Sequence, residues 1–251
     1  MELGAYEEMR AIEDHHWWYL GRRTLVRPLL ERALERGKRV LDIGCGTGAN
    51  LALVEELVAD AETFGLDFEP TALEFCRTRS LSAGLLRGDG MKLPIGDESL
   101  DCVTALDIVE HFDDDLGLIG EFHRVLKPGG EVVITVPQYP SLWSPHDEFL
   151  HHKRRYRKDE LESRLAEAGF ELAERRGFNF LLLPPIWLVR RLKARSQQKS
   201  GTEASGTDFF EVPGFVNWGM AKLFTLESWL VRLFPIRFGV SLMVRATKPS
   251  A

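Results

Sequence analysis

The stretch that decides the fold is VLDIGCGTGAN, residues Val40–Asn50, in which an apolar run with one aspartate ends at three glycines. A β-rich run followed by Gly44, Gly46 and Gly48 predicts a first strand that turns into a helix. Backbone without side chains lets a ligand approach the main-chain amides. Because GCGTGA also satisfies the dinucleotide fingerprint G-x-G-x-x-G/A, a dinucleotide, a phosphate and another nucleoside all remain open at this point.

The composition is that of an ordinary globular protein that can bury a substantial core. The chain has 251 residues, 44% of them apolar and 28% charged. A net charge of -6 argues against nucleic acid as the main partner. The three cysteines form no CxxC pair, which favours reduced thiols in a cytoplasmic location. The acidic start is no signal peptide, and no apolar run reaches the ~18 residues of a membrane span.

From residue 38 onward, β-rich runs alternate with helical stretches, which predicts βα units and a parallel sheet. The predicted strands are 39–44, 62–67, 84–89, 100–107, 130–137, 170–178 and 240–248. The predicted helices are 49–59, 70–79, 114–126 and 158–168. The span 179–237 is too long for a simple connection and predicts an insertion. Its middle, 196–208, has the composition of a flexible linker.

Three acids distinguish between the candidate ligands of the glycine loop. Asp42 would repel a pyrophosphate, but it suits a ligand with a positive amino group. Asp67, at the end of the second predicted strand, suits the ribose of NAD or of another adenosine ligand. Asp89, in RGDGMKLP, can accept a hydrogen bond from an adenine amine. Of these acids, Asp42 is the one that counts against a dinucleotide.

The ordered motifs VLDIGCGTG, GLDFEP, GDGMKLP, ALDIVEH and RVLKPGG resemble the class I S-adenosylmethionine-dependent methyltransferases of the bacterial small-molecule type. The resemblance implies an α/β, Rossmann-like, seven-stranded and mostly parallel sheet ordered 3-2-1-4-5-7-6, with helices on both faces and only the last strand antiparallel. It also implies four parts: an N-terminal helical lid (1–37), an α/β core (38–178), an apolar and basic helical insertion (179–239), and the last strand with the tail (240–251).

The resemblance also implies which residues hold the methionine part of the cofactor. Asp42 would lie near its amino group, and the loop against it would consist of Gly44, Cys45 and Gly46. The leader Glu13–Val26, EDHHWWYLGRRTLV, resembles segments that fold over the cofactor. Trp18 and either Arg22 or Arg23 would enclose the methionine end, since guanidinium can pair bidentately with a carboxylate. Alternatively, the tryptophans only pack the leader on the core.

The adenosine part would be held at the next strand ends. Asp67 would bind both ribose hydroxyls, with Phe68 against the adenine. The edge of the adenine would be framed by Asp89, Gly90 and Met91. The floor near the sulfonium would consist of Leu106 and Asp107. The alternative is that the acids at these strand ends only cap helices or turns.

Methyl transfer from a sulfonium is an in-line displacement, so the protein mainly aligns donor and acceptor and excludes water. A hydroxyl acceptor also needs a base, and histidine suits this near neutral pH. The candidates are His111 after the fourth strand and His146 or His151 in the loop after the fifth, with His152 beside them. A loop held together by packing is the alternative. Because His146, Asp147 and His151 match no recognised ligand frame, no metal is predicted.

The insertion bears on the acceptor. FNFLLLPPIWLVRRLKAR (178–195) joins an apolar segment to four cations, and LFTLESWLVRLFPIRF (223–238) has leucines at helical spacing. Such stretches can lie in the interface of a membrane with anionic lipids. They can equally pack on the domain, cover the active site or form a homodimer contact. The predicted function is O-methylation of a small or lipid-linked acceptor, in the cytoplasm or at the inner face of the membrane.

Three other functions remain as alternatives. A nicotinamide-dependent oxidoreductase would use the same glycine loop, but Asp42 counts against it. Nucleic-acid methylation is disfavoured because the fourth strand ends in ALDIVEH rather than in the Asn-Pro-Pro-aromatic edge that holds a flipped base. A non-catalytic cofactor-binding scaffold would have the same glycine loop.

Overall fold

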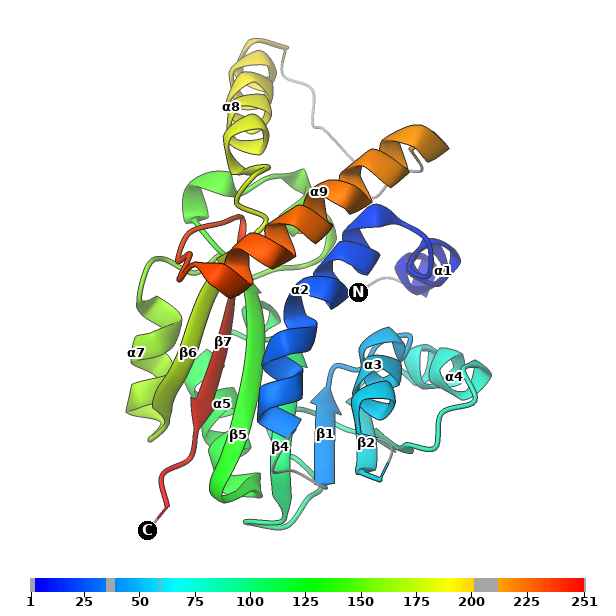
Figure 1. Cartoon of the computed structure of the whole chain (residues 1–251), viewed down its shortest axis with the longest axis vertical. Coiled ribbons are helices and arrows are strands. Elements are labelled where there is room, and N and C mark those ends of the chain that lie inside the picture. Colours follow the sequence, from blue (N-terminus) through cyan, green and yellow to red (C-terminus); the bar gives the residue numbers. More distant parts are fainter. Residues whose placement is uncertain (1–2, 35–38, 59, 201–211, 251) are drawn as a thin grey trace.

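The computed structural model describes residues 3–34, 39–58, 60–200 and 212–250, and it contains a seven-stranded sheet with helices on both faces (Figure 1). The strand order β3-β2-β1-β4-β5-β7-β6 confirms the predicted topology. Only β7 is antiparallel to its neighbours, as predicted. The strands are β1 (Arg39–Ile43), β2 (Glu62–Asp67), β3 (Gly84–Arg87), β4 (Leu100–Leu106), β5 (Leu126–Pro137), β6 (Glu171–Phe178) and β7 (Ser241–Thr247).

The helices fill the connections between the strands and extend beyond the sheet edge at which β1 ends (Figure 1). They are α1 (Leu3–Ile12), α2 (Trp17–Leu34), α3 (Ala49–Leu57), α4 (Pro70–Thr78), α5 (Asp115–Val125), α6 (Pro145–Phe149), α7 (Glu160–Glu167), α8 (Leu183–Ser200) and α9 (Gly214–Leu233). Two short 3-10 turns are η1 (Val109–His111) and η2 (Pro140–Leu142). Among the described residues, no helix combines the length and the hydropathy needed to cross a bilayer.

The sheet separates two hydrophobic cores because successive side chains of a strand point to opposite faces. Leu41 and Ile43 of β1 belong to the core under α5 and α7. Val40, on the same strand, belongs to the core under α2, α3 and α9. Strand periodicity therefore directs Asp42 to the same face as Val40, toward α2.

Helices α2 and α9 lie far apart in the sequence but pack directly on each other (Figure 1). Gly21 of α2 faces Phe224 of α9 so closely that an added Cβ would lie 2.3 Å from the phenyl ring. Trp17 and Trp18 meet the same ring edge-on, at centroid distances of 5.3 and 5.8 Å. The N-terminal segment and the insertion thus form one packed layer over the end of the sheet.

The structure differs from the prediction in two connections. Strand β5 begins at Leu126, not at residue 130, because the KPGG segment stays in the sheet and a register shift between Leu100 and Cys102 of β4 accommodates it. Helix α8 continues to Ser200, so the predicted linker at 196–208 begins inside a helix. Residues 201–208 of that linker lie outside the described residues.

Candidate active site

The glycine loop lies between β1 and α3 and is held by an acid of the neighbouring strand. Gly44 and Gly46 have φ values of 63° and 53°, in the left-handed region that favours glycine. Asp67, at the end of β2, accepts hydrogen bonds from the backbone amides of Gly46 at 2.8 Å and Glu69 at 3.0 Å. A Cβ on Gly46 would have only the Gly44 carbonyl oxygen, 3.9 Å away, within contact range. The loop therefore leaves its outer side open to a ligand.

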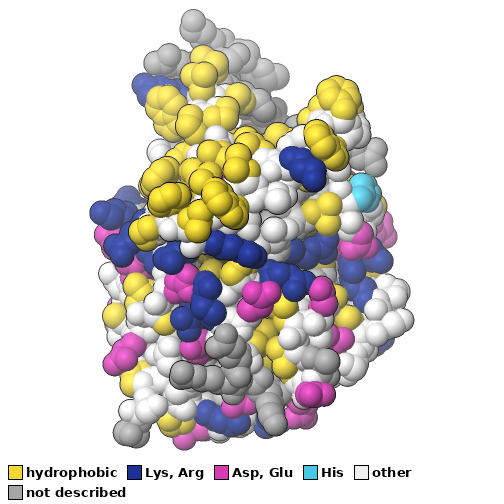
Figure 2. Space-filling view, viewed as in Figure 1, with side chains coloured by type: hydrophobic (Ala, Val, Ile, Leu, Met, Phe, Trp, Pro, Cys, Tyr) yellow, Lys and Arg dark blue, Asp and Glu magenta, His cyan; other side chains and the backbone are white. Residues whose placement is uncertain are grey.

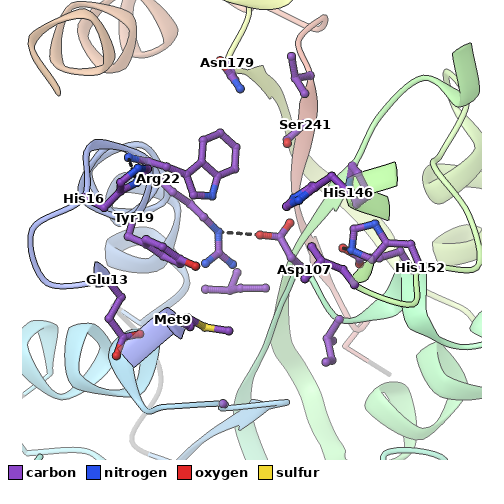
Figure 3. A pocket seen from close by; sticks show the side chains of 18 of the residues that line it. Met9, Glu13, His16, Tyr19, Arg22, Asp107, His146, His152, Asn179 and Ser241 are labelled. Carbon is purple, nitrogen blue, oxygen red and sulfur yellow. Dashed lines mark hydrogen bonds and ion pairs between the residues drawn. The ribbon is translucent and has the colours of Figure 1, made fainter. Parts of the chain in front are cut away.

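This open side faces a cavity of about 530 Å³, a size typical of small-molecule sites. Figure 3 shows Met9, Glu13 and Arg22 from the N-terminal segment on one side of the cavity, and Asp107 and His146 on the other. The predicted site residues that line the cavity are Trp18, Arg22, Gly44, Cys45, Gly46, Asp67, Leu106, Asp107, His111 and His146.

At one end of the cavity, polar atoms remain unpartnered. Arg22 is buried, and its Nε lies 2.7 Å from Oδ2 of Asp107, yet its Nη2 has no hydrogen-bond partner among the described residues. Asp42 is buried below the loop and accepts a 2.6 Å hydrogen bond from the hydroxyl of Thr104. Its second oxygen has no partner in the described chain. Arg22 lines the cavity, whereas Asp42 is not among the lining residues and lies behind the loop. The carboxylate and ammonium of an amino-acid group, which S-adenosylmethionine contains, match the charges of these two groups.

Burial raises the pKa of Asp42 to about 7, against the opposing hydrogen bond from Thr104 and the attraction of Arg22. The free protein therefore holds this carboxyl group near its titration midpoint at neutral pH. A bound cation favours the ionised form of a nearby carboxyl group. This behaviour suits a ligand with a positive amino group and disfavours a pyrophosphate.

Glu13 fastens the N-terminal segment onto the loop, a role that its sequence context does not signal. Its buried carboxylate accepts a hydrogen bond from the hydroxyl of Thr47 and forms an ion pair with Arg79 of the neighbouring connection. The Arg79 guanidinium also donates to the backbone carbonyl of Thr47 at 2.7 Å. Helices α1 and α2 thereby cover the loop from above.

The structure does not bring all of the predicted adenosine residues to the cavity. Phe68 is 64% exposed. Asp89 caps its own turn, because its carboxylate accepts a 3.0 Å hydrogen bond from the backbone amide of Met91. In the described part of the chain, Phe68, Asp89, Gly90 and Met91 are not among the residues that line the cavity. Asp67 alone of this group reaches it.

The opposite end of the cavity contains three histidines, His111, His146 and His152. The His152 ring packs edge-on against His111 at a centroid distance of 4.8 Å. Its Nδ1 forms a 3.0 Å hydrogen bond with buried Asp147. His151 is exposed, has a φ of 57° and does not contribute to the described cavity lining. The sequence alone could not order these neighbouring histidines, because the short helix α6 decides which of them turns inward.

Comparisons with known proteins agree with this geometry. Residues 41–134 match the methyltransferase domain family. A protein of Mycolicibacterium smegmatis named "Probable S-adenosylmethionine-dependent methyltransferase" is 27% identical over 70% of this chain and 68% of its own length. A demethylmenaquinone methyltransferase of Staphylococcus epidermidis is 35% identical, over 47% of this chain and 53% of its own length. The chain therefore spans only about half of the second relative.

A solved structure extends the likeness to the whole fold. The methyltransferase in complex with the Haloferax volcanii Trm112 methyltransferase activator superimposes with a TM-score of 0.64 at 21% identity, over 99% of this chain and 96% of that one. An identity this low bears on the fold alone. The strand order, the matched domain and the named relatives agree with an adenosine ligand and leave no support for a dinucleotide. Residues 41–134 thus belong to the methyltransferase domain family, and the named relatives and the strand order support a class I S-adenosylmethionine-dependent methyltransferase.

Proposed function

We propose that this enzyme methylates an oxygen of a small, apolar or lipid-linked acceptor that lies between the glycine loop and the histidine end of the cavity. The observation that carries the proposal is the continuity of one cavity from the loop to an apolar compartment. That compartment is lined by Pro137, Leu150, Leu182, Pro185, Ile186, Val189, Met220 and Val240. Such a lining suits an apolar acceptor body. The relatives named demethylmenaquinone methyltransferases support a small-molecule acceptor.

Bound S-adenosylmethionine supplies a methyl group that its sulfonium has already activated. In this proposal Arg22 and Asp42 bind the amino-acid end, and Asp67 binds the ribose. Helices α1 and α2 form a lid that keeps water from the transferred methyl group. The chain's contribution to the rate is then mostly alignment and exclusion of water.

We assign the role of base to His146. It lies on α6, whose start is fixed by a capping box between Ser144 and Asp147, and it faces the cavity. Burial lowers the pKa of His111 to about 4, with a further contribution from His152. A group with so low a pKa is a poor proton acceptor near neutral pH. His151 is exposed and is not among the described residues that line the cavity.

The test is methyl transfer from labelled S-adenosylmethionine to hydroquinones with and without an apolar tail, followed by identification of the methyl ether. His146→Gln should lower kcat about 100-fold, the usual contribution of a general base. The matched control, His151→Gln, should leave kcat unchanged because its side chain is exposed. Unchanged kcat in His146→Gln would contradict the assignment of the base. Methylation confined to amines would contradict O-methylation.

We further infer that the outer face of α8 and α9 contacts an anionic membrane from the cytoplasmic side. Figure 2 shows hydrophobic side chains gathered over these helices, with Lys and Arg side chains below them. Trp187, Trp218 and Trp229 are 42, 66 and 58% exposed. Val189 belongs to this face and also lines the cavity, so the face adjoins the apolar compartment. Apolar side chains with tryptophan and nearby cations are typical of interfacial helices.

A further inference from the structure

The histidine end of the cavity contains a carboxylate that the proposed methyl transfer does not use. Glu110 lies in η1, is fully buried, and neither of its oxygens has a hydrogen-bond partner in the described chain. Its Oε1 lies 3.9 Å from Nε2 of His152, beyond hydrogen-bonding distance. Buried carboxylates are nearly always hydrogen-bonded, so this one requires an explanation.

Two imidazoles face the same point as this carboxylate. Glu110, His111 and His152 each offer one ligand atom, and all three atoms lie within 4.8 Å of one another. All three residues line the cavity. They come from two segments, since Glu110 and His111 follow β4 whereas His152 follows α6. The fold therefore brings together two nitrogen donors and one oxygen donor around a single accessible point.

Each histidine of the cluster also has a polar contact with a residue outside the cluster. Nδ1 of His152 bonds to Asp147, whose same oxygen accepts a 2.7 Å hydrogen bond from Nε of Arg155. His111 has a hydrogen bond with the backbone of His151. Metal-bound histidines characteristically use their second nitrogen in this way, and a carboxylate is a frequent partner. The contact with Asp147 leaves Nε2 of His152 facing Glu110.

We propose that Glu110, His111 and His152 bind one divalent transition-metal ion, with an open coordination position toward the cavity. Two imidazoles and one carboxylate favour zinc or cobalt over magnesium, which prefers oxygen ligands. Three protein ligands leave room for one oxygen of an acceptor or of water. The cluster differs from the set His146, Asp147 and His151, which shows no ligand frame in the sequence. Binding of the ion does not depend on the proposed function. Only the contact between the ion and an acceptor rests on that function.

The experiment is a titration of untagged, metal-stripped, full-length protein with Co²⁺, followed by visible absorption, and with Zn²⁺, followed by calorimetry. We expect one ion per chain, the absorption bands of four- or five-coordinate Co²⁺, and displacement of Co²⁺ by Zn²⁺. Glu110→Gln and His152→Gln should each weaken binding by more than about 100-fold, above the cost of losing an outer-shell partner. His151→Gln, an exposed neighbour, should bind the ion as the native chain does.

Each outcome decides the proposal. Absence of binding, or binding that Glu110→Gln and His152→Gln leave unchanged, would overturn it. Affinity for S-adenosylhomocysteine, measured on every variant, shows that the fold is intact and does not depend on the ion. If the ion binds but no hydroquinone is methylated, the proposed function fails and the metal site stands. If methylation occurs without ion binding, the reverse holds.

Discussion

Asp42 accepts a hydrogen bond from Thr104 with one oxygen, and its other oxygen has no partner among the described residues. Its place just before the glycines already distinguished an amino group from a pyrophosphate, because that argument needs only the sign of a charge at a known turn. Glu110 could not be found in the same way. Its importance depends on having no partner, and that depends on η1, α6 and the leader being folded around it. Asp89 accepts a hydrogen bond from the backbone amide of Met91 in its own turn, and its contact with adenine stays a prediction.

The raised pKa of Asp42 makes cofactor affinity depend on pH. The group binds its proton up to a pH of about 7 instead of 3.8, so a cationic amino group can pair with it only after that proton is lost. Affinity for S-adenosylhomocysteine should therefore rise with pH, by up to about tenfold per unit below 7, and level off above. Calorimetry in buffers of different ionisation enthalpy should detect the released proton. In Asp42→Asn the affinity should not vary over this range; a slope that persists in this variant would refute the assignment.

At the scale of the elements, the motifs predict the sheet because they stand at strand ends whose order is fixed by βα connections. Predicted and observed strands therefore agree, except where glycines were interpreted as a turn. The KPGG segment reads as a loop, yet it remains in β5 because Leu126 pairs with Leu100. The contact of α2 with α9 could not be predicted, because the residue that requires a glycine at position 21 is Phe224, about 200 positions away.

Because of that contact, we expect the addition of one methyl group at Gly21 to lower the stability of the protein. In Gly21→Ala the new Cβ would lie 2.3 Å from the Phe224 ring, so the ring and the helices must shift. We expect a loss of about 1–3 kcal/mol in the free energy of unfolding. The matched control is Gly120→Ala in α5, where a Cβ meets nothing within 4 Å and should add up to about 1 kcal/mol. Thermal unfolding of both variants measures the difference; equal Tm values would contradict tight packing at Gly21.

At the scale of the whole molecule, the active site is assembled from segments that the sequence separates widely. The leader, the glycine loop, the turn after β4, the loop after β5 and the insertion all line one cavity. The sequence could assign each segment to one edge of the sheet. It could not predict how far the side chains of each segment reach into the cavity. The same holds for the surface, where hydrophobic side chains of α8 and α9 gather on one face (Figure 2).

This face predicts binding to membranes. Trp187→Ser combined with Trp229→Ser should abolish co-sedimentation with anionic vesicles, because both side chains are exposed and large. Binding should fall with salt, and vesicles of neutral lipid should bind less. Leu172→Ser, at a 47% exposed position on β6, is the control and should bind as the native chain does. If the native chain sediments as a dimer and ignores vesicles, the face is instead a homodimer contact.

The packing of Gly21 against Phe224 also fixes how ligands enter and leave. Helix α2 packs directly on α9 at this contact, whereas Glu13, which directly follows α1, bonds to Thr47 and Arg79. The N-terminal segment is therefore held at two places, by the packing of α2 on α9 and by the contacts of Glu13. We therefore expect α1 to move when S-adenosylhomocysteine is released, while the contact between α2 and α9 stays closed.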